Sequence, residues 1–121
     1  MELQVASLKG VPLLELQGDI DHSNCGAVET ALSEILNDGA QVVLLDFSRV
    51  TYLDSGGICV LLSGCRRARD SGWLGVIDPN QNVRRLLEIV GLLVDPGFRV
   101  FDDRPAAEAA LSGALSQEEE T

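Results

Sequence analysis

The residues best suited to chemistry stand together in segment 46–58, which reads DFSRVTYLDSGGI. The segment follows a short apolar run and precedes a helical pattern, so it lies at the carboxyl end of a predicted strand. Parallel α/β sheets place their functional sites at that edge. Ser55 stands at or beside the N-cap of the predicted helix, where unpaired backbone N–H groups and the helix dipole favour an anion. A phosphate on Ser55 would add about −1.5 to −2 charge units at this point.

Other interpretations of the same segment stay open from the residues alone. Serine is a favoured N-cap and stabilises a helix by about 1 kcal/mol relative to alanine, so Ser55 is more simply explained as a cap when viewed alone. Asp54 is equally suited to a turn or a cap. Gly56 and Gly57 have no side chains, so the backbone of a partner can approach closely. They are too few for a phosphate-binding loop, and no lysine follows them, which argues against a nucleotide-hydrolysing site.

The elements that must position this segment are predicted from periodicity. Alternating or apolar runs predict strands at residues 3–8, 11–16, 41–47, 73–77 and 98–101, with a polar loop at 48–55. Helical spacing of apolar residues occurs in 28–36, 58–65 and 83–90, and an alanine-rich helix is expected from Pro105 to about Leu115. Strands that alternate with helices indicate a single α/β domain with a mostly parallel sheet, to which an N-terminal β-hairpin adds an antiparallel element.

Turn and cap residues support these boundaries. Lys9-Gly10 is the expected hairpin turn. We expect Ser23 or Asn24 to cap the first helix with its side chain, and Asp78 or Asn80 to cap the third.

Length and charge limit the class of protein. The 121 residues suit one domain, which we expect to span residues 1–115, followed by a flexible acidic tail at 116–121. The formal net charge of −10 disfavours binding to nucleic acid or to an anionic membrane. The sequence has neither a long apolar span nor the pattern of a signal peptide, so we expect a cytoplasmic protein.

Cysteine and histidine are too sparse for a metal or cofactor site. The three cysteines, Cys25, Cys59 and Cys65, form no paired motif, so we expect them to be reduced and buried or half-buried. His22 is the single histidine, and no CxxC spacing is present, which disfavours a zinc site. No serine or cysteine has a recognisable base at a motif spacing, so we expect a protein that is not an enzyme.

Three motifs in register carry a family resemblance. Residues 42–62, VVLLDFSRVTYLDSGGICVLL, resemble the signature of STAS domains in bacterial anti-sigma-factor antagonists. Residues 18–21, GDID, are similar to the Gly-Glu-Leu-Asp that follows the second strand in that family. Residues 83–92, VRRLLEIVGL, resemble the family's third helix, which ends in Gly-Leu. The resemblance covers nearly the whole chain in the right order.

The resemblance implies a monomeric switch protein that binds an anti-sigma factor, often a serine kinase, and so releases a sigma factor. The kinase phosphorylates the serine of the Asp-Ser motif, here Ser55, the complex dissociates, and a phosphatase resets the switch. By this likeness, the residues expected to contact the partner are Asp19, Asp21, His22, Asp54, Ser55, Gly56, Gly57 and Ile58. We further hypothesise that Asp21 and Asp54 orient the Ser55 hydroxyl or contact the partner.

Two departures from the family pattern leave an alternative open. Gly56 stands where many relatives have Ser, Thr or Ala, and Asp19 replaces the commoner Glu. The alternative is a STAS domain that is never phosphorylated and serves as a subunit of a lipid-transport or stress-sensing assembly. The Asp54-Ser55 pair favours the phosphorylated switch, because a role without a phosphate acceptor does not require that hydroxyl.

Overall fold

The computed structural model describes residues 1–120, with side chains described through Ser112. The predicted acidic tail at 116–121 lies outside the residues described with their side chains. The elements in chain order are β1 (Glu2–Leu8), β2 (Val11–Ile20), α1 (Cys25–Asn37), β3 (Val42–Leu53), α2 (Ser55–Arg69), β4 (Trp73–Ile77), α3 (Gln81–Ile89), the short 3₁₀ helix η1 (Leu92–Val94), β5 (Phe98–Phe101) and α4 (Arg104–Glu120).

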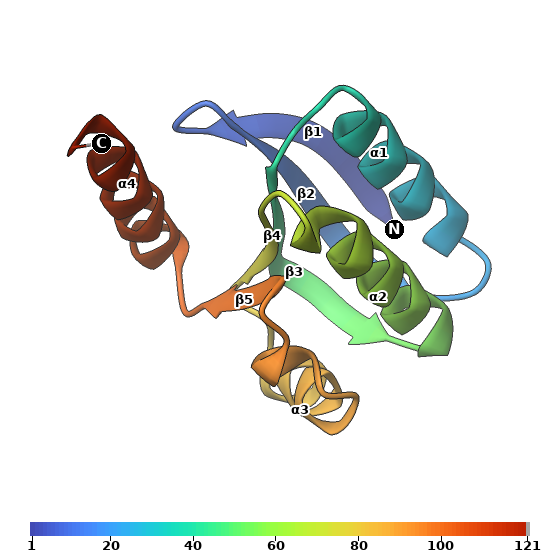
Figure 1. Ribbon diagram of the computed structural model, residues 1–121. Helices are drawn as coiled ribbons and strands as arrows, with labels where there is room; N and C mark the ends of the chain where they lie inside the picture. The colour runs from blue at the N-terminus through green and yellow to red at the C-terminus, as the bar shows by residue number, and fades with distance from the viewer. Residues whose placement is uncertain (121) are drawn as a thin grey trace.

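The strands, labelled in Figure 1, form one mixed sheet in the order β1-β2-β3-β4-β5. Strand β1 runs antiparallel to β2, and the other neighbouring pairs are parallel. Lys9 and Gly10 have φ values of 51° and 81°, which suit a two-residue hairpin turn whose twist matches that of the strands. The predicted α/β class, the N-terminal hairpin and the number of helices are confirmed.

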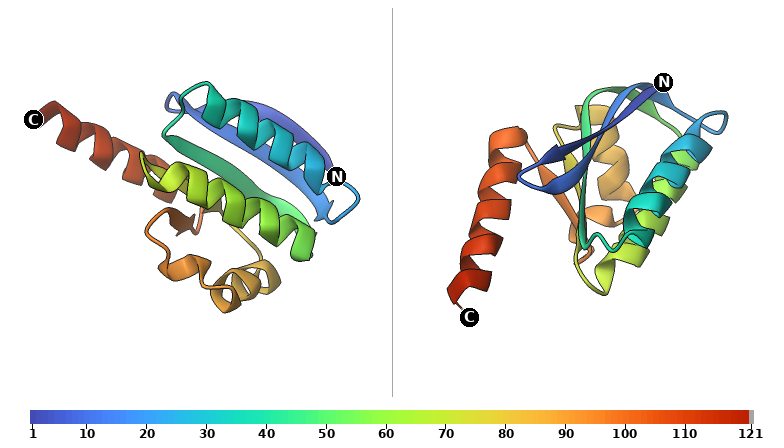
Figure 2. Two further views of the ribbon diagram at one scale, coloured as in Figure 1. Left: turned by 45° about the vertical axis from the view of Figure 1, so that its right-hand side comes forward. Right: turned by 90° about the horizontal axis from the view of Figure 1, so that it is seen from above.

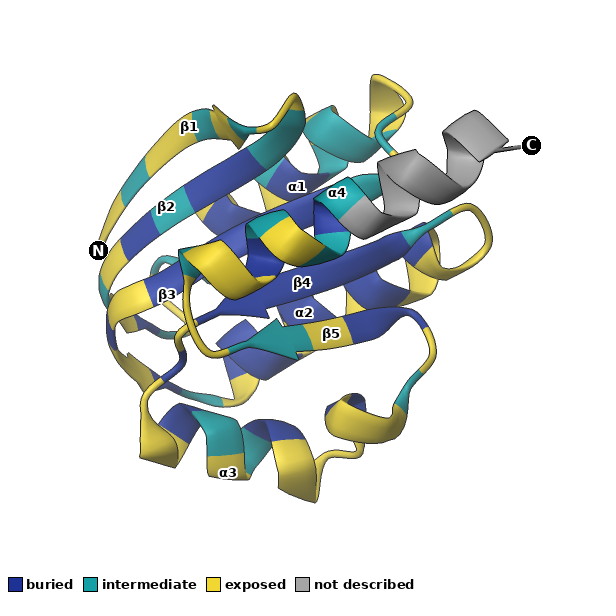
Figure 3. Cartoon of the chain, turned by 90° about the vertical axis from the view of Figure 1, so that its left-hand side faces the viewer, coloured by how far each residue is buried: buried dark blue, intermediate teal, exposed yellow. Residues whose placement is uncertain are grey.

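Two apolar layers cover the sheet, one on each face. Helices α1 and α2 lie side by side on one face (Figure 2), and their apolar residues share the larger core cluster with Val83 and Leu87 of α3. Helix α4 crosses the opposite face (Figure 3), where Ala107 and Leu111 pack on Leu13 and Leu44 in a smaller cluster. The loops after β2 and β3 therefore emerge together at one edge of the sheet, between the N-terminal ends of α1 and α2.

Strand β3 is longer than predicted, because the expected loop at 48–55 is strand up to Leu53. Strand β4 ends opposite Asp46, so only β2 pairs with the extension, through irregular register steps up to Ile20 and Leu53. The extension buries Val50 and Leu53 and exposes polar residues between them. This part of β3 pairs with one neighbouring strand where a central strand pairs with two, so it is more exposed. Its composition is therefore polar, and for that reason a loop was predicted.

The helix starts differ from each other in their caps. The Asn80 side chain accepts the Val83 N–H at 2.8 Å, so Asn80 is the cap of α3. Asn24 occupies the N-cap position of α1 but makes no side-chain cap bond, and its amide oxygen accepts the Asp21 N–H at 2.9 Å instead. The expectation that Ser23 or Asn24 caps α1 with its side chain was therefore wrong, because Asn24 is used within the loop after β2.

Candidate functional site at the carboxyl edge of the sheet

Asp54, and not Ser55, is the cap of α2. Its Oδ1 accepts the backbone N–H groups of Gly56 at 2.8 Å and Gly57 at 3.3 Å. Its own N–H donates to the Ile20 carbonyl at 3.1 Å, which ties the loop after β3 to the end of β2. Ser55 is thus the first helical residue beside the cap, and its side chain stays exposed. The hydroxyl is free for chemistry because it has no capping bond to make.

His22 comes from the loop after β2 and reaches the same point. Its Nε2 lies 3.0 Å from the Ser55 Oγ, a hydrogen bond whose donor depends on the protonation of the ring. The His22 N–H donates to the Asp54 Oδ2 at 3.2 Å, which fixes the backbone beneath the ring. The His22 side chain is 72% exposed and that of Asp54 is 20% exposed, and the Nε2 lies 4.0 Å from the Asp54 Oδ2.

Asp21 organises its own loop and makes no hydrogen bond to Ser55. Its Oδ1 accepts from the N–H of Ser23 at 2.9 Å and from the Ser23 hydroxyl at 2.5 Å. These two hydrogen bonds from Ser23 lower the pKa of Asp21. No hydrogen bond therefore supports the hypothesis that Asp21 orients the Ser55 hydroxyl, and its other part, that the half-buried Asp21 contacts a partner, stays a prediction.

Asp19 joins the end of β2 to β3 and to the loop before α1 at the same edge. The Asp19 Oδ1 accepts the Thr51 hydroxyl at 2.6 Å, and the Asp19 carbonyl accepts from the Asn24 side-chain amide at 2.9 Å. Asp19 is exposed, so the carboxylates of Asp19, Asp21 and Asp54 make this edge anionic.

Three of the predicted contact residues are buried. A Cβ added at Gly57 would lie 2.2 Å from the Leu53 Cδ1, and one at Gly56 would lie 2.9 Å from the His22 Nδ1. Ile58 is 8% exposed and belongs to the core. The expectation that Gly56, Gly57 and Ile58 contact a partner is therefore corrected: their role is to let α2 begin close against the loop and the sheet. The exposed members of the predicted set are Asp19, His22 and Ser55, with Asp21 and Asp54 half-buried.

The basic residues of α2 lie at its other end, and two of them, Arg67 and Arg69, have partners there. Arg67 donates to Ser33 at 2.9 Å and to Asn37 at 2.6 Å, both on α1. Arg69 pairs with Asp95 at 3.2 Å. These contacts hold α1 and the segment before β5 against α2, so Arg67 and Arg69 serve the packing of the helices.

An apolar hollow beside the site was not predicted from the sequence. It has a volume of about 300 Å³ and is lined by Thr51, Tyr52, Leu53, Asn82, Val83, Arg85, Leu86 and Ile89. Tyr52 is 54% exposed and Ile89 is 70% exposed. Tyr52, an aromatic residue inside a polar segment, could have indicated this hollow. It was overlooked because segment 48–55 was predicted to be a loop.

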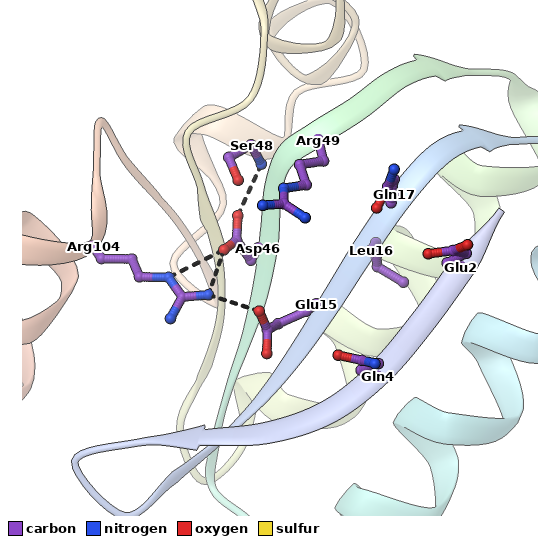
Figure 4. A pocket seen from close by; sticks show the side chains of 9 residues that line it. All are labelled: Glu2, Gln4, Glu15, Leu16, Gln17, Asp46, Ser48, Arg49 and Arg104. Carbon is purple, nitrogen blue, oxygen red and sulfur yellow. Dashed lines mark hydrogen bonds and ion pairs between the residues drawn. The ribbon is translucent and has the colours of Figure 1, made fainter.

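A second hollow, of about 290 Å³, lies on the α4 side of the sheet (Figure 4). There the Arg104 guanidinium donates to the Asp46 Oδ2 at 2.7 Å and to the Glu15 Oε2 at 3.1 Å. Burial raises the pKa of Asp46, but hydrogen bonds from Ser48 and the charge of Arg104 outweigh it and leave the pKa below its ordinary value. The Arg104 guanidinium lies between two carboxylates, so this cluster secures the start of α4 on the sheet.

The three cysteines differ in exposure, and none belongs to a candidate metal-binding group within the described residues. Cys65 is buried and Cys25 half-buried, whereas Cys59 is exposed on α2, so the expectation that all three are at least half-buried was wrong for Cys59. All three are free thiols in the structure. Within the described part of the chain, no group of three or more His, Cys, Asp or Glu residues has the geometry to hold a metal ion. Nor does any helix among those residues have the length and apolar character to cross a membrane.

Comparisons with known proteins agree on one family. A family model described as "Mlab, STAS domain" matches residues 3–94. Anti-sigma-F factor antagonist RsfB of Mycobacterium tuberculosis is 32% identical over 109 residues, which cover 90% of this chain and 88% of RsfB. BtrV of Bordetella bronchiseptica, also named as an anti-sigma factor antagonist, is 32% identical over 116 residues, covering 95% of this chain and 98% of BtrV.

Solved structures share the fold. The crystal structure of an anti-sigma factor antagonist from Mycobacterium paratuberculosis superimposes with a TM-score of 0.76 at 24% identity, covering 93% of this chain and 92% of that one. The unphosphorylated form of the anti-sigma factor antagonist SpoIIAA gives a TM-score of 0.75 at 18% identity, covering 92% of this chain and 97% of SpoIIAA. The phosphorylated form of the Bacillus SpoIIAA gives 0.71 at 18% identity, covering 90% and 99%.

Proposed function

The chain belongs to the STAS domain family, and from this premise we propose that it is an anti-sigma factor antagonist controlled by phosphorylation of Ser55. In the unphosphorylated state it binds an anti-sigma factor and thereby frees a sigma factor for transcription. The anti-sigma factor, acting as a serine kinase, transfers the γ-phosphoryl group of ATP to the Ser55 Oγ and releases ADP and the hydroxyl proton. The complex then dissociates, and a phosphatase restores the hydroxyl.

The observation that carries this proposal is the position of the Ser55 hydroxyl. It is exposed at the first turn of α2, and the neighbouring Asp54 does the capping that serine would otherwise do. A kinase therefore has access to an oxygen that the fold does not need for the helix start. The 32% identity to RsfB and BtrV over nearly the whole chain supports the same reading.

The electrostatics of the edge favour dissociation once Ser55 is phosphorylated. Asp19, Asp21 and Asp54 already make the surface anionic, and a phosphate adds about −1.5 to −2 charge units at its centre. A partner surface that tolerates the unmodified edge then meets additional repulsion and the cost of desolvating the phosphate. We expect the exposed residues Asp19, His22 and Ser55 to touch the partner, with Asp21 and Asp54 at the margin, and the free protein to be a monomer.

The test is the intact mass of the protein after incubation with ATP and each candidate anti-sigma kinase from its own cell. One phosphate on the wild type, none on Ser55→Ala and one on Ser23→Ala would support the proposal. Ser23 is the matched control because it is an exposed serine on the neighbouring loop. A pull-down with the same kinase should recover the unmodified protein and lose the phosphorylated one.

The alternative from the sequence is a subunit of a lipid-transport or stress-sensing assembly that is never phosphorylated. No phosphate with any candidate kinase, together with recovery of transporter subunits in the pull-down, would replace the proposal by this alternative. Ser55 would then be only a residue of the first helical turn.

A further inference from the structure

Three backbone N–H groups in the first turn of α2, where a phosphate was expected to bind, are already occupied. The Asp54 Oδ1 accepts the N–H groups of Gly56 at 2.8 Å and Gly57 at 3.3 Å, and the Ile58 N–H bonds the Asp54 carbonyl at 3.0 Å. A phosphate on Ser55 therefore meets a carboxylate where an open helix N-terminus was expected. Like charges repel, so the phosphate must find its counter-charge elsewhere.

His22 is the group in position to supply that charge. Its Nε2 lies 3.0 Å from the oxygen that would carry the phosphate, and its ring is 72% exposed. The Asp54 Oδ2 holds the His22 backbone from below and lies 4.0 Å from the Nε2. Among the residues whose side chains the structure describes, no arginine or lysine forms a hydrogen bond or an ion pair with Ser55 or Asp54.

The missing side chain at Gly56 makes room for the ring. A Cβ at position 56 would lie 2.9 Å from the His22 Nδ1, 3.1 Å from the Asp54 Oδ1 and 3.2 Å from the Cys25 Sγ. Any of these separations requires a neighbour to move, and the exposed ring is the freest of the three to do so. Glycine at position 56, where many relatives have a larger residue, thus leaves the space in which the His22 ring reaches Ser55.

We propose that His22 binds the phosphate of phosphorylated Ser55 without covalent transfer. The imidazolium ring forms an ion pair with the phosphate at the place where the ring now contacts the hydroxyl. This inference rests on the proposed function, because it requires that Ser55 is modified. Phosphorylation then joins the loop after β2 to the start of α2 by a charge pair, and the strength of that pair depends on pH. Arginine would be charged at all pH values, whereas histidine gains and loses its charge near neutrality.

The groups that face the ring come from three elements. The Asp54 Oδ2, just after β3, lies 4.0 Å from the Nε2; the Cys25 Sγ, at the start of α1, lies 3.8 Å from the His22 carbonyl oxygen; and Asp21 precedes His22 in its loop. The two carboxylates are present in both states of the protein. The phosphate is the group that changes between the states, so a difference in the titration of the ring reports on it.

The experiment is an NMR titration of the His22 ring C–H resonances in protein freed of any purification tag. His22 is the single histidine of the chain, so the assignment is unambiguous. Phosphoserine is installed at position 55 during synthesis, which makes the result independent of any kinase. We expect the titration midpoint of the ring to move to higher pH by about one unit or more in the phosphoprotein, as an opposite charge at this range does.

Variants separate the pair from a general effect of charge. The phosphate itself titrates near pH 6, so the titrations of the ring and of the phosphate are coupled. Without the positive ring, the phosphate of phosphorylated His22→Gln should titrate with a higher midpoint, seen in its ³¹P resonance, than that of the wild type. Gly56→Ala should shrink the shift of the ring by at least half. Gly26→Ala, where nothing lies within 4 Å of the added Cβ, should leave it unchanged.

An unchanged ring midpoint in the phosphoprotein overturns the proposal. A full shift that survives in Gly56→Ala overturns the role assigned to Gly56. Failure of every kinase to modify Ser55 would count against the proposed function, while the titration of the synthetic phosphoprotein would still give its own answer about His22.

Discussion

Replacing Asp54 by alanine tests the architecture of the site most directly. The substitution removes the oxygen that accepts the N–H groups of Gly56 and Gly57 and the oxygen that accepts the His22 N–H. Loss of an N-cap side chain costs about 1 kcal/mol, within a range of about 0.5–2. The lost hydrogen bond to His22 adds about 0.5 kcal/mol. We therefore expect Asp54→Ala to lower the free energy of unfolding by about 1.5 kcal/mol, within a range of about 1–2.5.

Asp54→Asn is the informative companion. Asparagine keeps one side-chain oxygen for the helix start and ranks with aspartate as a cap. It loses the negative charge that the helix dipole favours, worth about 0.3–1 kcal/mol, so we expect a smaller loss than in Asp54→Ala. Ser55→Ala removes an exposed hydroxyl with no cap bond and should change stability by no more than about 0.5 kcal/mol.

Urea unfolding followed by tryptophan fluorescence measures all three variants. Trp73 is the single tryptophan, is 7% exposed and lies in the cluster beneath α4, so its signal reports global unfolding away from the site. Equal m-values would show that the same surface is exposed in each variant. Asp54 is not the cap if Asp54→Ala unfolds at the wild-type urea concentration, or if Ser55→Ala is destabilised as strongly, since the cap would then be the serine.

Three further predictions concern the support of the site. Arg104→Ala should make the protein less stable at neutral pH. Because the pKa of Asp46 is lowered in the folded protein, its carboxylate stabilises the fold above about pH 4, and this stabilisation is lost as the pH falls through the pKa of the folded state. Arg104 contributes to the lowered pKa, so the free energy of unfolding measured from pH 7 to pH 3 should fall less steeply in Arg104→Ala than in the wild type. Parallel slopes would contradict this. Gly57→Ala should cost about 1–3 kcal/mol, because the added Cβ would lie 2.2 Å from a methyl group of a core leucine; wild-type stability in thermal unfolding would disprove the close contact. Burial, with a smaller effect of Asp95, raises the pKa of Cys65 to about 11, so at pH 8 a thiol reagent should label the exposed Cys59 well before Cys65, and equal rates in a mass-spectrometric time course would refute the burial.

Local patterns were sufficient for the elements and for the family. Periodicity and turn chemistry predicted the features that depend on neighbours in the chain. These are the apolar runs of β4 and of the buried half of β3, the apolar faces of the helices, and the turn at Lys9. The resemblance to STAS domains, carried by residues 42–62 and two shorter motifs, is confirmed by the family match over residues 3–94. The assignment of Ser55 as the phosphate acceptor stays a prediction.

What the tertiary structure alone decided is how the two loops meet. The pairing of Ile20 with Leu53 sets the register of β2 on β3, and that register brings His22 to Ser55 and the Asp54 N–H to the Ile20 carbonyl. A slip of one residue in that pairing would turn each side chain to the opposite face of the sheet. Composition and spacing carry no information about such a register across 33 residues of chain, so neither the closed cap at Asp54 nor the ring over the Ser55 hydroxyl was visible before the strands were paired.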